Sequence, residues 1–251
     1  MRKIAVVTGA SRGIGRAIAM RLGASGFCVG VHYGVSCAAA FEVVRSIEGR
    51  GGAAFAFGCD LAASDPGRRF WQAYDAAASW AGVESSSIAV LVNNAGVTLR
   101  GTIEDFGDED FIAQQAVNVN APYFITRQAL PRLIDNARVI NISSGVTRIA
   151  FPDIIAYALT KGAIDAFTRT LAQHLGSRGI TVNAVAPGVV DTDINAWLRG
   201  NEEAIENVVA DSALGRLGQP EDIAGVVSFL ASRDSGAITG QVIDATHGTR
   251  L

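Results

Sequence analysis

The stretch Lys3-Ile4-Ala5-Val6-Val7-Thr8-Gly9-Ala10-Ser11-Arg12-Gly13-Ile14-Gly15 opens as an apolar, β-rich run and closes with three nearby glycines. Behind it, Ala17, Ile18 and Leu22 continue an apolar stripe at helical spacing. A strand, a glycine-rich turn and a helix in this order favour phosphate binding, because the backbone approaches a pyrophosphate and the helix N-terminus supplies N–H donors. The spacing, G-x-x-x-G-x-G, departs from the general G-x-G-x-x-G fingerprint. A purely structural turn before a helix is the alternative reading.

Short apolar runs alternate with helical patterns along the rest of the chain. Strands are predicted at Phe27–Tyr33, Ala53–Phe57, Ala89–Val92, Val139–Ile142, Gly179–Val185 and Val242–Asp244. Helices are predicted at Cys37–Ile47, from a capping Ser64 to about Trp80, at Asp108–Leu133, within Thr192–Ala213, and at Ile155–Leu175 and Pro220–Leu230. This alternation predicts an α/β fold, a doubly wound parallel sheet of about seven strands with helices on both faces, in one domain over residues 1–251.

Short polar or glycine-rich segments follow several of the predicted strands. These segments are Gly9–Gly15, Asp60, Asn93–Gly96, Ser143–Ser144 and Pro187–Gly188. In an open parallel sheet, ligands bind outside the carboxyl ends of the strands. These segments are therefore expected to border one crevice, and together they are stronger evidence than any single motif.

Composition narrows the class of protein further. The 251 residues are 49% hydrophobic and 18% charged, with a net charge of −3 and no run of Lys or Arg, so nucleic acid is not an expected partner. The apolar runs are too short for a membrane span, and the N-terminal one is too short for a signal peptide. Cys28, Cys37 and Cys59 have no metal-ligand spacing, so no metal site is expected and a cytoplasmic, reducing compartment is predicted.

Tyr157 and Lys161 lie one helical turn apart. An ammonium beside a phenol favours the phenolate and lowers the phenol pKa, which makes the pair a candidate acid/base. The pair alone is also typical of an ordinary helix surface. Its neighbours in the sequence decide between these readings.

Several motifs occur together in one order and spacing: Thr8–Gly15, Asn93-Asn94-Ala95-Gly96, Ser144, Tyr157-x-x-x-Lys161 and Pro187-Gly188. On these residues the chain resembles the short-chain dehydrogenase/reductase family over nearly its whole length, and most closely the branch of the 3-oxoacyl-carrier-protein reductases. The resemblance implies a Rossmann-type domain and an oxidoreductase acting on carbonyls or secondary alcohols.

The same resemblance implies the catalytic roles. Tyr157 would exchange a proton with the substrate oxygen, and Lys161 would hold down the phenol pKa and hydrogen-bond the nicotinamide ribose. Ser144 would hydrogen-bond the substrate oxygen. Asn118 would position a water in a proton relay to Lys161, with Asn120 as the less favoured alternative.

A nicotinamide cofactor is implied as well, and the predicted contacts are Gly9, Ser11, Arg12, Gly13, Ile14, Gly15, Tyr33, Asp60, Leu61, Asn94, Ala95, Gly96, Tyr157, Lys161, Pro187, Gly188, Val190 and Thr192. Asn93 is expected to tie strands together instead. The end of the second strand, His32–Ser36, has no acid to repel a 2′-phosphate, and Arg12 offers a cation. NADP(H) is therefore predicted over NAD(H), with a merely solvated Arg12 as the alternative.

The substrate is the least specified part of the prediction. A 3-oxoacyl thioester or a related ketone is the best guess, bound by Gly145–Ile155 and a substrate loop of about residues 189–215. Phe151, Ile154, Trp197 and Leu198 make these loops apolar, which also suits core packing. Acyl carrier protein is a possible partner: Arg178 offers a cation, while the nearby Asp135 would blunt such docking.

Several other expectations accompany this reading. A catalytically silent nucleotide-binding regulator or scaffold is the main alternative, and a sugar-nucleotide epimerase or dehydratase is disfavoured because those chains usually continue into a substrate domain. A homotetramer or homodimer is implied through Asp108–Leu133 and Ile155–Leu175. His247 is expected to be structural or interfacial, and His32 and His174 receive no functional role.

Overall fold

Seven parallel strands form the centre of the protein in the order β3-β2-β1-β4-β5-β6-β7. The structure is a computed structural model and describes residues 2–83 and 87–251. The sequence predicts a polar linker at Gly82–Ser87, and part of it lies outside the described residues. The strands are β1 (Ile4–Val7), β2 (Cys28–Tyr33), β3 (Ala53–Gly58), β4 (Ile88–Asn93), β5 (Leu133–Ile142), β6 (Thr181–Pro187) and β7 (Val242–Ala245). The predicted α/β fold class, a doubly wound parallel sheet, is confirmed.

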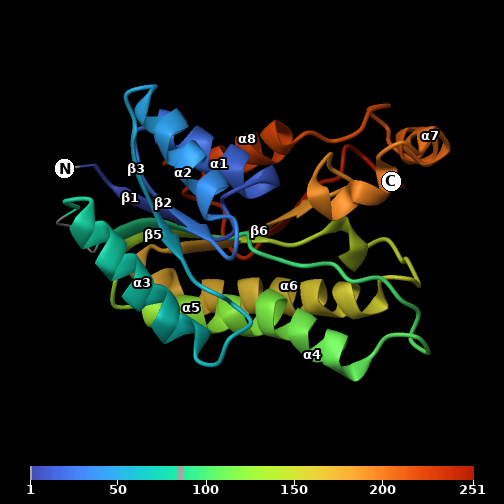
Figure 1. Ribbon diagram of the computed structural model, residues 1–251, viewed down its shortest axis with the longest axis horizontal. Coiled ribbons are helices and arrows are strands. Elements are labelled where there is room, and N and C mark those ends of the chain that lie inside the picture. Colours follow the sequence, from blue (N-terminus) through green and yellow to red (C-terminus); the bar gives the residue numbers. More distant parts are fainter. Residues whose placement is uncertain (1, 84–86) are drawn as a thin grey trace.

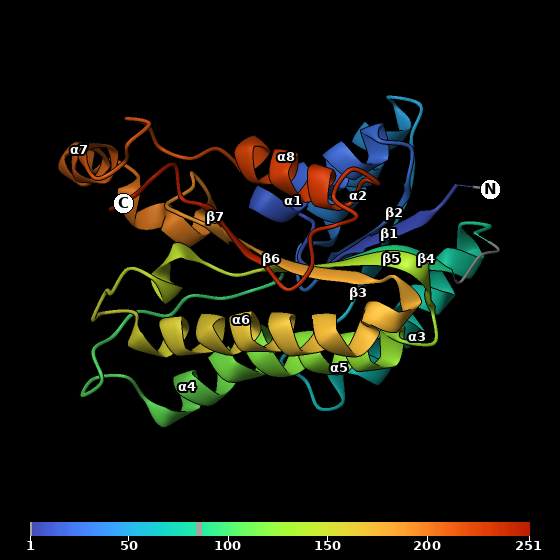
Figure 2. The same cartoon turned by 180° about the vertical axis from the view of Figure 1, so that it is seen from behind.

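Helices cover both faces of this sheet (Figures 1 and 2). One layer contains α1 (Gly13–Ala24), α2 (Cys37–Glu48) and α8 (Pro220–Leu230). The other contains α3 (Pro66–Trp80), α4 (Asp108–Gln115), α5 (Ala121–Ala129) and α6 (Ile155–Leu175). No helix in the described ranges is long and apolar enough to cross a membrane.

The alternation of side chains along a strand divides the core into two clusters. In β1, Ala5 and Val7 pack in the cluster that includes Ile18 of α1, while Ile4 and Val6 pack in the cluster that includes Phe70 of α3. All four β1 side chains are buried. A strand buried on both faces reads as a continuous apolar run, which is why β1 is recognisable in the sequence.

The predicted helix Asp108–Leu133 is wrong in its extent. A π-helical turn, Ala116–Asn120, separates α4 from α5, and Leu133 already belongs to β5. Pro122 has no N–H, and a proline ring crowds the carbonyl four residues earlier, here that of Asn118, so the ordinary α-helical ladder is interrupted at this point. The apolar periodicity continues across the interruption, which hides it from a pattern-based reading.

A smaller difference concerns the start of α3, whereas the helical prediction within Thr192–Ala213 agrees with the structure. The residue that precedes α3 is Asp65, in a left-handed conformation with φ 53° and without a side-chain cap, so the predicted serine cap is wrong. The Thr192–Ala213 region contains a 3₁₀ turn, η4 (Asp193–Leu198), and α7 (Glu202–Ala210). Two further 3₁₀ turns are η2 (Gly145–Thr147) and η3 (Gly176–Arg178).

Candidate active site

The carboxyl ends of β1, β4, β5 and β6 lie along one edge of the sheet, because these neighbouring strands are parallel. The predicted segments Gly9–Gly15, Asn93–Gly96, Ser143–Ser144 and Pro187–Gly188 each follow or end one of these strands. The α6 helix covers one face of the sheet and carries Tyr157 and Lys161 in its first two turns (Figure 1). The sheet therefore brings together segments that are far apart in the sequence.

Lys161 is the most informative side chain at this edge. It is only 4% exposed, and its Nζ donates to the Ile142 carbonyl at 2.8 Å. The same ammonium lies 5.4 Å from the ring centroid of Tyr157, one turn earlier on α6. Among the described residues it makes no ion pair with a carboxylate. A buried cation without a carboxylate is costly and is typical of a functional site.

Asn118 lies in the π-helical turn and is 1% exposed. Its Nδ2 donates to the Val97 carbonyl at 2.9 Å and to Thr160 Oγ1 at 3.1 Å, while its Oδ1 accepts from the Val97 N–H at 2.9 Å. Asn118 thus fastens the segment after β4 to α6 beside Lys161. Asn120 is exposed, whereas Asn118 is buried, and the catalytic role of Asn118 stays a prediction.

Ser143 and Ser144 end up on different sides of the chain, as successive residues of an extended segment do. Ser143 is buried and its Oγ donates to Asp165 at 2.5 Å. Ser144 precedes η2, and its Oγ accepts from the Val146 N–H at 3.3 Å. Ser143 is therefore engaged in the interior, and Ser144 is the serine left at the edge of the sheet.

The glycine-rich turn is packed too tightly for side chains. Gly9 has φ 61°, and a Cβ on Gly15 would lie 2.2 Å from the Gly9 carbonyl oxygen. Asn94 holds the turn from outside, since its Nδ2 donates to the carbonyls of Thr8 at 2.8 Å and Gly9 at 3.1 Å. The cradle and the α1 N-terminus behind it fit a pyrophosphate.

Asn93 behaves as predicted, since its Nδ2 donates to Asn141 Oδ1 at 2.8 Å and to Thr126 Oγ1 at 3.0 Å. These bonds tie β4 to β5 and to α5 in the interior. Asn93 is 4% exposed, so its side chain has a structural role in the sheet.

His32 is a residue of this edge that sequence reasoning missed. It is 1% exposed, its Nδ1 accepts from the Gly9 N–H at 3.0 Å, and its Nε2 donates to the Cys59 carbonyl at 2.9 Å. Burial lowers the pKa of His32 from 6.5 to about 4, so the ring is neutral and its tautomer is set by these partners. The only sequence signal was a polar residue within an otherwise apolar strand.

The other predicted cofactor residues lie around the same edge with different surroundings. Arg12 is exposed at the start of α1, 3.4 Å from the carboxylate of Asp193 in η4. Thr192 packs near Gly13, because a Cβ added to Gly13 would lie 3.2 Å from the methyl carbon of Thr192. Leu61 and Val190 have buried side chains, so only their backbones can meet a ligand.

Tyr33 ends β2, and Asp60 follows β3 and accepts from the Ala62 N–H at 2.9 Å. Ser11, 9% exposed, and Ile14 lie between the glycines of the turn. Ala95 and Gly96 follow β4, and Pro187 and Gly188 lie at the end of β6. The cofactor contacts predicted for these residues stay predictions.

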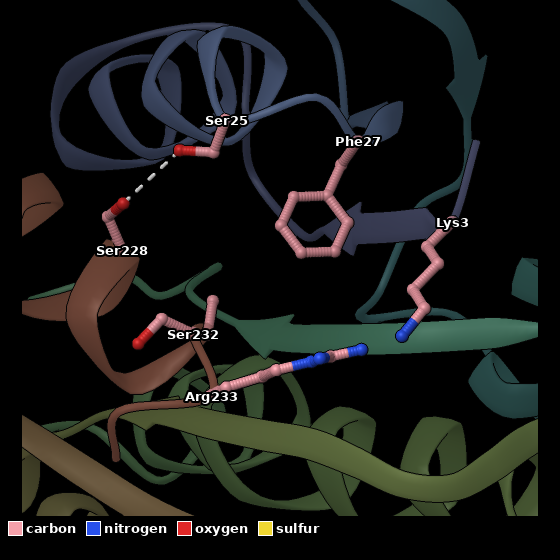
Figure 3. A pocket seen from close by; sticks show the side chains of 7 residues that line it. Lys3, Ser25, Phe27, Ser228, Ser232 and Arg233 are labelled. Atoms are coloured by element: carbon pink, nitrogen blue, oxygen red, sulfur yellow. Dashed lines mark hydrogen bonds between the residues drawn. The ribbon is translucent and has the colours of Figure 1, made fainter.

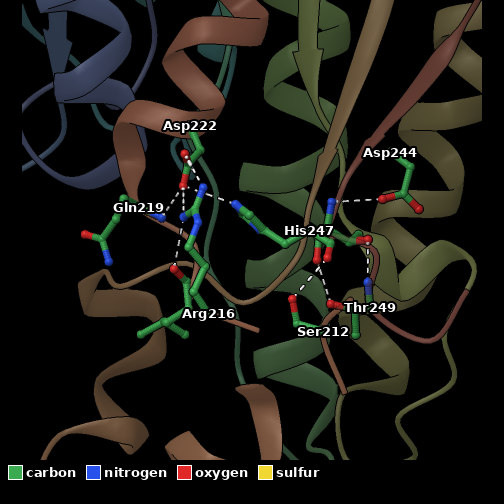
Figure 4. A network of polar contacts seen from close by, with 9 residues as sticks. Ser212, Arg216, Gln219, Asp222, Asp244, His247 and Thr249 are labelled. Carbon is green, nitrogen blue, oxygen red and sulfur yellow. Dashed lines mark hydrogen bonds and ion pairs between the residues drawn. The ribbon is translucent and has the colours of Figure 1, made fainter. Parts of the chain in front are cut away.

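The C-terminal segment adds a polar network near the substrate loop (Figure 4). Asp222 at the start of α8 accepts two bonds from Arg216 and lies 3.1 Å from His247 Nε2. Hydrogen bonds from Arg216 hold the pKa of Asp222 well below its usual range. His247 has φ 61° and is fixed also by Ser212, which donates to its carbonyl at 3.0 Å. These contacts give His247 the structural role that was expected.

A hollow at the opposite edge of the sheet is separate from this site (Figure 3). Its lining includes Lys3 before β1, Phe27 before β2, and Ser232 and Arg233 after α8. The amino ends of parallel strands lie at the edge opposite their carboxyl ends. The hollow therefore has no part in the Tyr157–Lys161 region.

Comparison with known proteins agrees with the geometry of a nucleotide-binding oxidoreductase. A family model described as Enoyl-(Acyl carrier protein) reductase matches residues 9–250. An uncharacterized oxidoreductase of Methylorubrum extorquens is 42% identical over 250 residues, which cover 99% of this chain and 98% of the relative. The 3-oxoacyl-[acyl-carrier-protein] reductase FabG of Staphylococcus aureus is 36% identical, with 99% and 98% covered.

Among solved structures, the angucycline C-6 ketoreductase LanV with bound NADP superposes with a TM-score of 0.94. It is 43% identical, and the match covers 99% of this chain and 96% of that one. The chain belongs to the short-chain dehydrogenase/reductase family, as the sequence motifs predicted.

Proposed function

We propose that this protein is an NADPH-dependent ketoreductase that converts a ketone to a secondary alcohol, with Tyr157 as the proton donor. The observation that carries the proposal is the buried Lys161 ammonium, 5.4 Å from the Tyr157 ring centroid and hydrogen-bonded to the Ile142 carbonyl. A cation held there stabilises negative charge on the phenol oxygen after proton transfer. LanV, named a ketoreductase and crystallised with NADP, supports the same reaction class.

The cofactor, when bound, supplies a hydride to the carbonyl carbon of the substrate. Tyr157 then delivers the proton to the carbonyl oxygen, and Ser144 donates a hydrogen bond to that oxygen as negative charge develops. Asn118 keeps Val97 and Thr160 in place around Lys161. These four residues, Asn118, Ser144, Tyr157 and Lys161, form the proposed catalytic set.

The residues at the glycine-rich turn fit a dinucleotide. The space between Gly9 and Gly15 excludes a side chain, and the α1 N-terminus begins directly behind it at Gly13. Arg12 offers a cation for the 2′-phosphate, and β2 ends without an acid that would repel it. This supports NADPH over NADH.

A 3-oxoacyl thioester is the second candidate substrate, because the FabG relatives are named for that reaction. Docking of an acidic carrier protein would need free cations near the cleft. Arg178, the cation considered for this docking, lies in η3 before the amino end of β6, at the edge opposite Tyr157 and Lys161, and it already donates to Asp135 at 3.0 Å and to the Leu130 carbonyl at 2.9 Å. A ketone without a carrier is therefore the favoured substrate.

We also propose that the protein assembles as a homodimer or homotetramer. Large apolar side chains are exposed on α4, α5 and α6, namely Phe111, Ile112, Tyr123 and Leu159. An apolar surface of this kind is typical of an interface between copies. Sedimentation velocity tests the assembly, and a monomer at micromolar concentration would contradict it.

The test of the proposed reaction is the oxidation of NADPH by wild type and Tyr157→Phe with a panel of ketones, quinones and acyl thioesters. Removal of the phenol hydroxyl is expected to lower kcat by about 10²–10⁴-fold, the usual contribution of general acid catalysis. The Kd for NADPH is expected to stay within about twofold, because the phenyl ring remains. Tyr74→Phe in α3 is the matched control, since it also removes only a phenol hydroxyl. Failure of wild type with the whole panel would favour the silent scaffold instead.

A further inference from the structure

Three loops at the catalytic edge meet in one contact. Arg100 lies in the segment after β4, Asp153 lies between η2 and α6, and Trp197 lies in η4 after β6. Arg100 forms an ion pair with Asp153, and its guanidinium carbon lies 5.3 Å from the ring centroid of Trp197. The contact joins the predicted substrate loop to the segment after β4 and to the segment before α6.

The segment after β4 that carries Arg100 is held in place by backbone hydrogen bonds. The Gly101 N–H donates to the Asp153 carbonyl at 2.8 Å, and Gly101 forms a parallel bridge with Ile154. The Leu99 N–H also donates to Gln114 at 2.7 Å. Arg100 is thus presented from a supported position beside Asp153, which is only a few residues along the chain from Tyr157.

The indole of Trp197 has its polar edge satisfied within its own turn. Its Nε1 donates to Asn195 Oδ1 at 3.2 Å, and Asn195 Nδ2 donates to the Val190 carbonyl at 2.8 Å. The ring is still 38% exposed. What Trp197 offers to the outside is therefore aromatic surface, and its hydrogen-bonding group is already used.

Other apolar side chains are exposed on the segments that follow β4 and β6. Val97 after β4, Ile194 in η4 and Leu214 after α7 are 37%, 53% and 65% exposed. Exposed apolar side chains on segments that follow the strands favour an apolar ligand. An indole ring adds a preference for a flat, conjugated one, because stacking depends on facing π surfaces.

We propose that Trp197 determines substrate specificity by stacking on flat aromatic or conjugated ketones, and that Arg100, held by Asp153, positions its indole ring. This inference rests on the proposed ketoreductase function and names its substrate class. Trp197 contacts the substrate, whereas Arg100 and Asp153 act through Trp197. Small open-chain ketones reach Tyr157 without using this surface.

The test compares two carbonyl substrates under anaerobic conditions, the flat tricyclic phenanthrenequinone and the open-chain ethyl acetoacetate. Trp197→Ala is expected to raise KM for phenanthrenequinone about tenfold, as the loss of a stacked ring does, with kcat and the KM for ethyl acetoacetate within about twofold. Trp197→Phe should recover most of the affinity. Arg100→Ala should raise the same KM about threefold, less than Trp197→Ala does, because the indole remains.

The matched control is Trp80→Ala, since Trp80 is 88% exposed at the end of α3. Equal losses with both substrates in Trp197→Ala would overturn the inference but leave the ketoreductase function intact. A smaller oligomer of Trp197→Ala in sedimentation would also overturn it, in favour of an interface role. If wild type reduces neither substrate, the proposed function fails, and calorimetric titration of the NADP⁺ complex with phenanthrenequinone tests Trp197 alone. Equal affinity of wild type and Trp197→Ala would then overturn the stacking role.

Discussion

The Gly9 N–H donates to His32 Nδ1 at 3.0 Å, so a buried histidine of β2 holds the first glycine of the glycine-rich turn. The other ring nitrogen is fixed by the Cys59 carbonyl at 2.9 Å, beyond the end of β3. Both bonds require the neutral ring with its proton on Nε2. Three neighbouring strand ends, those of β1, β2 and β3, are joined through one imidazole.

This arrangement predicts a loss of stability in acid. The folded-state pKa of His32 is lowered to about 4 from 6.5, mainly by burial, so the unfolded chain takes up a proton first as the pH falls. The stabilisation of the folded state by neutral His32 is complete above about pH 6.5 and is lost as the pH falls to about 4. This is a change of about 3 kcal/mol in the free energy of unfolding. Urea unfolding across this range measures it. His32→Gln should flatten the pH dependence, whereas the exposed His174→Gln should not.

The cofactor preference is predicted to depend on Arg12. Its side chain is 66% exposed and pairs only weakly with Asp193 at 3.4 Å, so it is available to a 2′-phosphate. Arg12→Ala is expected to raise the KM for NADPH about tenfold and to leave that for NADH within about twofold, because only NADPH carries this charge. Arg16→Ala, one turn further along α1, is the control. Wild type that uses NADH with the lower KM would contradict the prediction.

The opposite effect is expected at Asp193. Its carboxylate accepts from Arg199 and lies beside Arg12, and the bond from Arg199 lowers the pKa of Asp193. Asp193→Asn removes a negative charge near the proposed phosphate and should lower the KM for NADPH by about twofold to threefold. Steady-state kinetics at low and high salt measure the effect. An increase in KM would mean that Asp193 orders the loop more than it repels the cofactor.

Gly15 is predicted to tolerate no side chain. A Cβ would lie 2.2 Å from the Gly9 carbonyl oxygen and 2.4 Å from Asn94 Nδ2, so Gly15→Ala must displace the turn. NADPH binding is expected to be lost, and the melting temperature is expected to fall. Gly225→Ala in α8 is the matched control, since nothing lies within 4 Å of its Cβ position. That change should stabilise the protein by about 0.5–1 kcal/mol, because alanine favours a helix. Unchanged NADPH affinity in Gly15→Ala would contradict the proposed cradle.

Asp222 is predicted to stabilise the start of α8. Its carboxylate forms a capping box with Gln219 and accepts from Arg216 and His247. Asp222→Ala should lower the free energy of unfolding by about 1–2 kcal/mol, the usual cost of a lost helix cap. Glu221→Ala, in the same first turn, is the control, and chemical denaturation measures both. Equal losses would show that general helix-dipole charge matters more than the network.

Much of the fold follows from local pattern. The bounds of α6 and α8 were predicted as Ile155–Leu175 and Pro220–Leu230, and the structure has the same limits. An apolar stripe and the early proline of α8 are properties of neighbouring residues, so they are visible in the sequence. The break at Ala116–Asn120 was not predicted, because the apolar periodicity continues through it.

The candidate catalytic residues were recognisable because they recur at one spacing within a family, whereas their surroundings depend on distant partners. Lys161 is buried against the Ile142 carbonyl, and Arg100 meets Trp197 from a different loop. His32 meets Gly9 only because β1 and β2 lie side by side. Glycine spacing and apolar periodicity by themselves predicted the alternating elements, the parallel sheet and the glycine-rich turn after β1. The tertiary structure alone decided which polar groups are buried and paired, because burial and hydrogen bonding join residues that are distant along the chain.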